Sequence, residues 1–328
     1  MEPLGFALER PATLADAVAT LAAHPDARPI AGGTDLLPNL RHGLGRPALL
    51  VDVAGVPGLD AIVREPDGTL VLGAAATLAR IVRDRGIAHG LPALHEAAAA
   101  VAGPSHRSMA TLGGNLCLDT RCVFYNQSEW WRRANAFCLK HGGDTCHVAP
   151  QGRRCHAAYA GDTAPALIAL GAEVEVAGPG GTRTLPLEAL YADDGAKPLT
   201  LACGELVCAV RIPRQPAGSA SGYRKARMRG AIDFPLAGVA VRLALDAGRV
   251  ASLRVALTGT NSHPLLLDGT DALVGAAIDD AALTALAKLV QKQVAPMRTT
   301  ACAANWRRVT AAVMARRLAA GLAASCGG

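Results

Sequence analysis

The sequence contains few aromatic residues, few charged residues and no long uncharged apolar run. Of its 328 residues, 3% are aromatic and 18% are charged, while 51% are hydrophobic. This composition is typical of a globular protein and argues against disorder. The first residues lack the basic stretch and apolar run of a secretory signal, and Arg316 and Arg317 interrupt the apolar helix expected near residues 311–324. We therefore expect a soluble, cytoplasmic protein with no membrane partner.

A strong excess of charge is also missing. The formal net charge is +6, which is modest for this length. Local basic pairs occur at Arg132–Arg133 and Arg153–Arg154. Basic pairs of this kind can bind nucleic acids or acidic proteins, but most of them are simply solvated side chains on the surface. We therefore expect no nucleic-acid partner. The nine cysteines are an odd number, and a cytosolic chain keeps its thiols reduced.

The scarce aromatic residues gather around a group of cysteines. The segment that contains Cys122, Cys138, Cys146 and Cys155 also holds five of the eleven aromatic residues of the chain. Thiolates bind soft metals and iron–sulfur clusters, and bulky rings keep water away from such a centre. The segment therefore predicts a metal centre in an otherwise plain sequence of Ala, Leu, Val and Gly.

Helix and strand signals alternate along the rest of the chain and predict a mixed α+β fold. Apolar residues recur at helical spacing after Thr13, a short strand follows at residues 28–31, and further strands are expected at 69–74 and 206–212. The C-terminal third predicts an antiparallel strand pair followed by two helices, after a linker at residues 214–221. We expect three subdomains, with the cysteine segment inserted in the second. Their bounds are 1–56, 57–215 with an insert at 117–160, and 216–328.

Two glycine turns predict a nucleotide site. The turn Gly32–Asp35 follows a strand and precedes a helix, and the turn Thr111–Asn115 offers the same chemistry. Bare backbone N–H groups at a helix start hold phosphates. Two such turns fit the two halves of a dinucleotide pyrophosphate. Neither has the Gly-x-Gly-x-x-Gly spacing, and no acidic residue closes a Rossmann unit, so the pattern points away from a nicotinamide site.

The order of these motifs resembles the flavin subunits of the xanthine dehydrogenase family of molybdenum hydroxylases. The resemblance rests on Ala31–Leu36, Thr111–Asn115, Gly161–Leu167 and the segment from Tyr223 to Phe234. It implies the fold of that flavoprotein and a bound FAD. The implied contacts are Pro29, Ile30, Ala31, Gly32, Gly33, Thr34, Asp35, Leu36, Val101, Thr111, Gly113, Gly114, Asn115, Asp162, Val207 and Lys225. Val101 and Val207 are placed near FAD by spacing only.

The cysteine spacing leaves alternatives open. Intervals of fifteen, seven and eight residues between successive cysteines are wider than those of zinc ribbons, and the bacterial ferredoxin run is missing. Spacing alone permits Cys117 as a metal ligand in place of Cys122, but Cys117 lies right after the second glycine turn. His141, His147 and His156 flank the cysteines. A mixed Cys/His zinc site is therefore the structural alternative to an iron–sulfur cluster.

The insert itself resembles that of the 4-hydroxybenzoyl-CoA reductase β subunits, which are flavin subunits with an added [4Fe–4S] loop. The resemblance rests on Asn115–Cys122 and Tyr125–Arg132. It implies that Cys122, Cys138, Cys146 and Cys155 bind a [4Fe–4S] cluster.

This resemblance also implies partners. A large molybdopterin subunit and a small [2Fe–2S] subunit would complete a dimer of heterotrimers, and a reduced ferredoxin would dock near Arg132, Arg133, Arg153 and Arg154. Electrons would pass through the cluster and FAD to molybdenum, where a phenolic hydroxyl of the CoA thioester is removed. The chain itself would carry no catalytic residue. The alternatives are the FAD subunit of an aldehyde or purine dehydrogenase and a zinc-stabilised, non-redox binding module.

Overall fold

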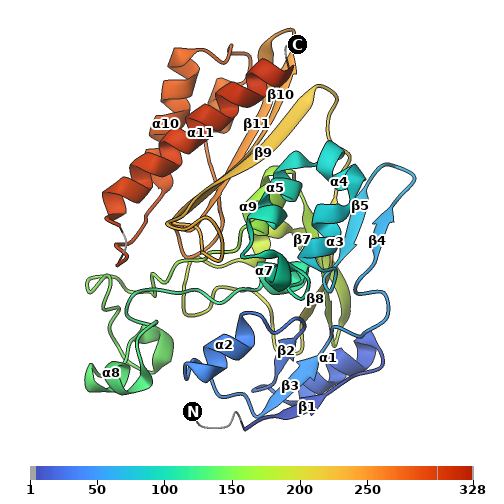
Figure 1. Ribbon diagram of the computed structural model, residues 1–328, viewed down its shortest axis with the longest axis vertical. Coiled ribbons are helices and arrows are strands. Elements are labelled where there is room, and N and C mark those ends of the chain that lie inside the picture. The colour runs from blue at the N-terminus through green and yellow to red at the C-terminus, as the bar shows by residue number, and fades with distance from the viewer. Residues whose placement is uncertain (1–4, 301, 327–328) are drawn as a thin grey trace.

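The computed structural model describes residues 5–300 and 302–326. Within them, the strands form a parallel sheet of three strands and two antiparallel sheets of five and four strands. Figure 1 shows the parallel sheet at the bottom, the five-stranded sheet at the right and the four-stranded sheet at the top. The predicted mixed α+β fold is confirmed.

The N-terminal region forms a βαβ-like unit with parallel strands. Its elements are β1 (Ala7–Glu9), α1 (Leu14–Ala23), β2 (Arg28–Ile30), α2 (Leu36–Arg41) and β3 (Leu49–Asp52), with strand order β1-β3-β2. The Thr13 hydroxyl accepts from the Asp16 amide, and the Asp16 carboxylate accepts from the Thr13 amide. This reciprocal capping box fixes the start of α1. Strand β2 then delivers the chain directly to the first glycine turn.

The central region joins an antiparallel sheet to a group of helices. Its strands are β4 (Ile62–Arg64), β5 (Leu70–Gly73), β6 (Glu173–Gly178), β7 (Gly181–Pro186) and β8 (Leu206–Ile212). Its helices are α3 (Leu78–Arg83), α4 (Arg85–Gly90), α5 (Pro92–Ala100), α6 (Pro104–Arg107), α7 (Leu112–Leu116) and α9 (Thr163–Ala169), with a 3-10 turn at Leu187–Leu190. Apolar side chains of α5, α9 and β8 pack in one buried cluster. Strands β6 and β7 form an antiparallel hairpin.

The C-terminal region places helices over both faces of its sheet. Its elements are β9 (Ser219–Ala226), β10 (Ala237–Asp246), β11 (Arg249–Thr258), β12 (Leu265–Leu266), a 3-10 turn (Thr270–Leu273), α10 (Asp280–Gln293) and α11 (Ala304–Cys326). Helices α10 and α11 cover one face (Figure 1), while α5 and α9 contact the other. The predicted linker at 214–221 is wrong at its end, because β9 already begins at Ser219 and pairs with β10.

Helix α11 meets, by length and composition alone, the criterion for a membrane-crossing helix, and no other helix in the described part of the chain does. Core helices of soluble proteins meet the same criterion. Here Ala311, Ala315 and Leu318 of α11 are buried in the cluster that the C-terminal sheet forms with α10. The helix therefore contributes its apolar face to the core of this region.

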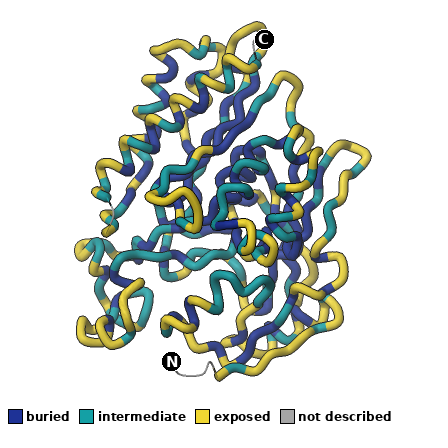
Figure 2. The backbone as a smooth tube through the Cα atoms, viewed as in Figure 1, coloured by how far each residue is buried: buried dark blue, intermediate teal, exposed yellow. Residues whose placement is uncertain are grey.

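The cysteine insert has a different construction. Residues 117–160, all of which the structure describes, contain the short helix α8 (Glu129–Ala134) and a 3-10 turn (Leu139–His141) but no strand. An isolated bridge between Arg121 and Ala158 closes the base of the insert. Figure 1 shows it as a lobe beside the body, and Figure 2 shows that most of its backbone is exposed or half-buried.

Candidate functional site

The first glycine turn lies against the segment that precedes the second. A Cβ atom on Gly32 would stand 1.9 Å from the backbone oxygen of Met109, and Gly33 has a φ of +67°. Only glycine fits the first position without moving backbone, and the left-handed conformation favours glycine at the second. This contact sets the first turn against Met109 and Ala110, which directly precede the second turn, so the two predicted halves of the nucleotide site are neighbours.

Backbone donors remain available at the first turn. In the described part of the chain, the N–H groups of Gly32, Gly33 and Thr34 donate no hydrogen bond. Free N–H groups in a glycine turn bind anions such as phosphate. Helix α2 has only six residues, so these donors matter more than the helix dipole. The turn therefore fits a nucleotide pyrophosphate, as the FAD prediction requires.

The second glycine turn differs from the sequence-based expectation. It forms the first turn of α7, in which Leu112 N–H donates to Ala76, Gly113 N–H to Ala74 and Gly114 N–H to the Thr111 hydroxyl. These backbone donors are already satisfied. The expectation that both turns offer the same bare N–H groups is therefore wrong, because the Thr111 cap and the backbone oxygens of the segment after β5 accept from those of the second turn. Contacts of Thr111, Gly113 and Gly114 with FAD remain a prediction.

Asn115 and Asp162 connect the second turn to the C-terminal region. The Asn115 Oδ1 accepts hydrogen bonds from the backbone N–H and the hydroxyl of Thr163, at 3.1 and 2.7 Å. The Asp162 carboxylate accepts from the Tyr223 hydroxyl at 2.6 Å and from Lys225 Nζ at 2.8 Å. The structure thus brings together three segments that lie far apart in sequence, and all of them carry predicted FAD residues.

The Asp162–Lys225 ion pair is buried, since each side chain is only 4% exposed. Burial raises the pKa of Asp162, and the ammonium of Lys225 counteracts this effect. Lys225 Nζ also donates to the backbone oxygen of Ala100. A buried pair of this kind is satisfied by hydrogen bonds on both sides and fixes the register of the elements that carry it. Here it holds β9 against α9 and the end of α5.

The other predicted FAD residues fall into two groups. Pro29 and Ile30 lie in β2, Ala31 follows it, and Leu36 begins α2, so this group surrounds the first turn. Asp35 follows the turn, and partial burial raises its pKa. The two valines lie elsewhere. Val101 follows α5 and packs against the main core, and Val207 in β8 is 3% exposed within that core.

Four cysteines of the insert line one cavity. Cys122, Cys138, Cys146 and Cys155 surround it together with Phe124, Tyr125, Leu139, Lys140, His147 and Val148. The aromatic rings and the buried position of three of the thiols exclude water, as an iron–sulfur site requires. Cys117 does not line this cavity and packs instead against the main core. The structure therefore groups Cys122, rather than Cys117, with the other three cysteines.

Burial dominates the chemistry of the cysteine thiols. It raises the pKa of Cys117 to about 12 and that of Cys155 to about 11, and it also raises the pKa of Cys122. The nearby Lys140 ammonium lowers the pKa of Cys155, in opposition to burial. A metal must displace protons from such thiols, so binding and deprotonation are coupled.

Two of the three histidines of the insert, His141 and His147, pack against its aromatic rings. The His147 ring stacks on Phe124 with centroids 4.2 Å apart, and its Nε2 lies 2.6 Å from the backbone oxygen of Phe137. His141 packs against Tyr125 and Phe137. Burial lowers the pKa of His141 and of His156. Within the described residues, no group of three or more His, Cys, Asp or Glu side chains is arranged so that it could hold a metal ion.

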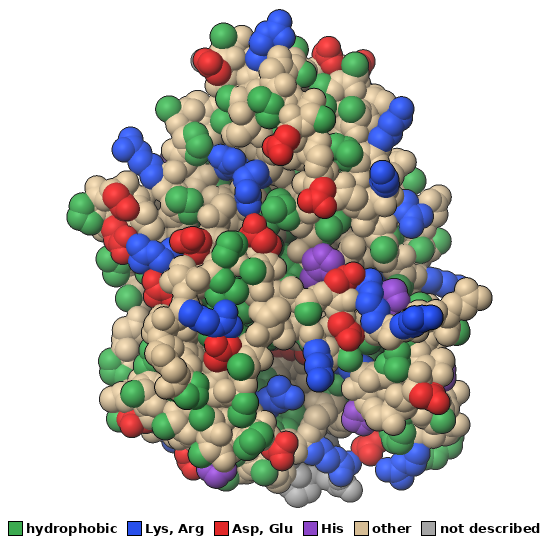
Figure 3. Space-filling model, turned by 180° about the vertical axis from the view of Figure 1, so that it is seen from behind, with side chains coloured by type: hydrophobic (Ala, Val, Ile, Leu, Met, Phe, Trp, Pro, Cys, Tyr) green, Lys and Arg blue, Asp and Glu red, His purple; other side chains and the backbone are tan. Residues whose placement is uncertain are grey.

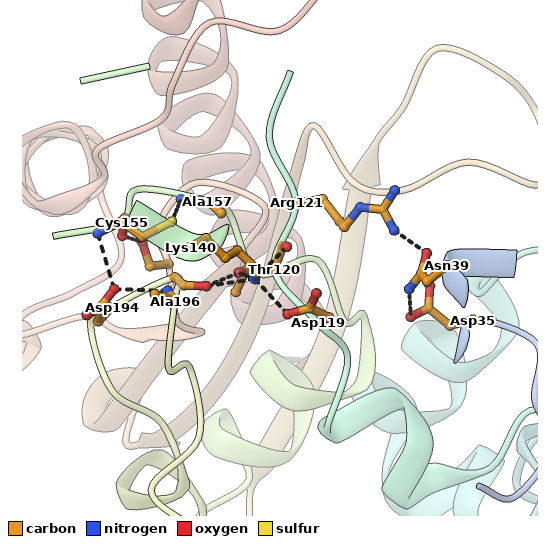
Figure 4. Close-up of polar contacts among 12 residues, drawn as sticks. Asp35, Asn39, Asp119, Thr120, Arg121, Lys140, Cys155, Ala157, Asp194 and Ala196 are labelled. Atoms are coloured by element: carbon orange, nitrogen blue, oxygen red, sulfur yellow. Dashed lines mark hydrogen bonds and ion pairs between the residues drawn. The ribbon is translucent and has the colours of Figure 1, made fainter. Parts of the chain in front are cut away.

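A polar chain joins the insert to the first glycine turn (Figure 4). Asn39 Nδ2 donates to Asp35 at 2.8 Å, and Arg121 Nη1 donates to the Asn39 side-chain oxygen. Arg121 also forms the backbone bridge to Ala158 at the base of the insert. The sequence-based reasoning assigned no role to Arg121 or Asn39. The only local signal is that Arg121 directly precedes Cys122, whereas its partner is more than eighty residues away.

The basic residues of the insert are less available than the sequence suggests. Arg132 is fully buried, and it donates to the backbone oxygens of Tyr125 and Gly43 at 3.0 and 3.1 Å. Arg154 pairs with Asp193 at 2.8 Å. Arg133 and Arg153 remain exposed. Acidic and basic side chains are interspersed over the face in Figure 3, which hence shows no large patch of one sign.

Comparisons with known proteins agree with this arrangement. The family described as the FAD binding domain in molybdopterin dehydrogenase matches residues 4–215, and the CO dehydrogenase flavoprotein C-terminal domain matches residues 221–322. The carbon monoxide dehydrogenase medium chain of Afipia carboxidovorans is 32% identical and covers 97% of this chain and 96% of its own length. The xanthine dehydrogenase FAD-binding subunit of Escherichia coli O157:H7 is 28% identical with the same coverage.

A solved structure supports the same assignment. Reconstituted CO dehydrogenase from Oligotropha carboxidovorans superposes with a TM-score of 0.81 at 29% identity, over 99% of both chains. Both the fold and the family descriptions thus extend over nearly the whole sequence. The chain belongs to the FAD-binding medium subunits of the molybdenum hydroxylase family, of the type found in xanthine and carbon monoxide dehydrogenases.

Proposed function

We propose that this FAD-binding subunit also holds a [4Fe–4S] cluster and serves as the electron-entry subunit of its complex. The single observation that carries the proposal is the cavity on which Cys122, Cys138, Cys146 and Cys155 converge. Four thiolates are the usual ligand set of such a cluster. Wide sequence spacing is compatible with it, because each thiolate approaches a different iron.

Two further features of the cavity suit a centre held by four thiolates, and metal analysis distinguishes a cluster from zinc. A zinc ion draws four ligands to about 2.0–2.3 Å from one point, whereas a cubane spreads them over four corners. The four thiols surround a common space lined by Phe124 and Tyr125, and the charge of the buried Lys140 side chain lowers the pKa of Cys155. Thiolate-ligated clusters carry net negative charge, so a neighbouring cation and a dry wall both favour their binding.

The residues of this chain would bind and orient the two cofactors. The free N–H groups of the first glycine turn would hold the FAD pyrophosphate, and the buried Asp162–Lys225 pair would keep β9 in place at the site. The aromatic side chains of the insert would exclude water from the thiolates. When bound, the flavin supplies two-electron chemistry and the cluster supplies single-electron transfer.

The proposed complex is a molybdenum-dependent 4-hydroxybenzoyl-CoA reductase. The insert supports this choice, because its sequence resembles the cluster-binding loop of those β subunits. A molybdopterin large subunit and a [2Fe–2S] small subunit would be the partners, reduced ferredoxin the donor and the cytoplasm the location. The second candidate is the FAD subunit of another hydroxylase, which the likeness to xanthine and carbon monoxide dehydrogenase subunits favours. Assays of the purified complex with 4-hydroxybenzoyl-CoA, an aldehyde and a purine distinguish the two.

Metal and flavin analysis of the full chain tests the cluster. Purified without oxygen, it should contain about four iron, four sulfide and one FAD per polypeptide. Cys138→Ser should remove most of the iron while FAD remains bound, since the thiols and the glycine turn are separate sites.

Cys117→Ser is the matched control and should keep its iron, because Cys117 lies in the core rather than at the cavity. Stoichiometric zinc in place of iron would contradict the proposal. If Cys117→Ser loses its iron and Cys122→Ser keeps it, then Cys117 rather than Cys122 is the fourth ligand.

A further inference from the structure

Lys140 is a buried cation with an unusually complete set of acceptors. Its side chain is 5% exposed, and Nζ lies 2.6 Å from Asp119 Oδ1, 2.5 Å from the Thr120 hydroxyl and 3.0 Å from the Thr120 backbone oxygen. The backbone oxygen of Gly195 is a further acceptor at 2.7 Å. Such a site holds an ammonium group at one position, as Figure 4 shows.

The side chain of Lys140 forms part of the wall of the cysteine cavity. Lys140 lines the cavity with the four cysteines, and Nζ lies 4.9 Å from the centre of the Tyr125 ring, which lines it as well. Lys140 is two residues from Cys138 in the sequence. The ammonium, held beside the Tyr125 ring, lowers the pKa of the Cys155 thiol, so its charge acts on a thiol of the cavity.

The partner carboxylate does not cancel this charge completely. The Asp119 side chain is 40% exposed, whereas that of Lys140 is 5% exposed. Solvent screens an exposed charge more strongly than a buried one. The other three acceptors are neutral oxygens, so the field in the cavity retains a positive component from Lys140.

We propose that Lys140 stabilises the reduced state of the centre held by the four cysteines and so raises its reduction potential. The inference rests on the proposed cluster. Reduction adds one electron, and hence one negative charge, to the centre, and no bond or proton transfer at Lys140 is involved. A fixed cation beside the centre favours the more negative state. Lys140 is thus a positioning and tuning residue rather than a catalytic one.

A purely structural role is the competing explanation, since Lys140 also joins the start of the insert at residues 119–120 to the loop of Gly195. The two roles predict different results for a pair of variants. Lys140→Gln removes the cation, whereas Asp119→Asn removes the opposing negative charge and leaves the cation. Electrostatic tuning shifts the potential in opposite directions in the two variants. A structural clamp weakens cluster retention in both and gives no such opposition.

The experiment is a redox titration of the iron-loaded full chain with dithionite and mediator dyes, followed by the visible or paramagnetic signal of the cluster. We expect Lys140→Gln to favour the oxidised state about tenfold, which is a midpoint lower by about 59 mV for one electron. Asp119→Asn should raise the midpoint. Lys197→Gln, an exposed lysine on the loop of Gly195, is the control and should leave it unchanged.

Each outcome bears on one proposal. Wild-type protein without iron and sulfide overturns the proposed cluster, and this inference with it. Iron-loaded variants whose midpoints stay at the wild-type value, or move in the same direction, overturn the role of Lys140 alone. If Lys140→Gln does not retain iron, Asp119→Asn becomes the test, because that variant keeps the ammonium. A higher midpoint in Asp119→Asn supports the tuning role of Lys140, and an unchanged or lower midpoint overturns it.

Discussion

The body of the protein and the cysteine insert are stabilised by different interactions. In the body, Leu72, Leu94 and Leu167 have no exposed surface and pack among other apolar side chains. In the insert, the largest fully buried side chain is that of Arg132, whose partners are backbone oxygens. Figure 2 shows the same contrast as dark blue strands and helices beside a largely teal and yellow lobe.

This difference indicates what each region needs in order to fold. Burial of apolar side chains contributes about 1.5–3 kcal/mol per large residue, so the body has a core of its own. A segment of about forty residues seldom buries enough surface alone and usually depends on metals or disulfides. The insert, with its four thiols around one cavity, is a segment of this second kind.

Substitutions at Arg132 and Leu94 should produce the largest effects and separate the two regions. Leu94→Ala should lower the free energy of unfolding of the whole chain by about 2–5 kcal/mol, because it leaves a cavity in the body. Arg132→Met should cost about 3 kcal/mol, since two backbone oxygens lose a charged donor. In the Arg132→Met variant, hydrogen exchange should be faster in residues 117–160, while the protection of α5 should stay unchanged. Equal loss of protection in both regions would contradict the distinction.

Substitutions in the polar chain that links the two regions should have an effect of intermediate size, on the binding of FAD. Asn39→Ala or Arg121→Gln breaks the hydrogen bonds that lead from the insert to Asp35. We expect FAD to bind about three- to tenfold more weakly, which corresponds to about 1 kcal/mol. Fluorescence titration of the flavin-free chain measures this change. The control is Arg133→Gln, which changes an exposed arginine of the same insert. An equal loss of FAD affinity in this control would contradict a specific role for the link.

The smallest effect is expected at the surface of the insert. Of the four arginines proposed from the sequence for ferredoxin docking, Arg132 is buried and Arg154 is paired with Asp193. Changing Arg133 and Arg153 together to glutamate should slow reduction by ferredoxin several-fold at low salt and leave dye-linked turnover intact. The same double change at Lys288 and Lys292 on α10 should have little effect. If wild type and the Arg133/Arg153 variant are reduced by ferredoxin at the same rate, ferredoxin does not dock at this surface.

Much of the fold was predictable because its signals are local. The bounds of β8 at Leu206–Ile212 and of α10 at Asp280–Gln293 agree with the apolar spacing of the sequence, and the Thr13 hydroxyl caps α1 as expected. The linker prediction failed at its end, since Ser219–Ala226 gains its partner only when β10 lies beside it. Pairing partners distant in sequence leave little trace in local composition.

The sequence by itself determined the kinds of chemistry in this protein: glycine turns suited to a nucleotide and a group of thiols suited to a metal centre. Only the tertiary structure decided which residues share a site. It placed Cys122 at the cavity and Cys117 against the core, buried Arg132, and paired the N–H groups of the second turn with Ala74, Ala76 and the Thr111 hydroxyl. The physical reason is that burial and hydrogen-bond partners depend on contacts between distant segments, which spacing along the chain does not encode.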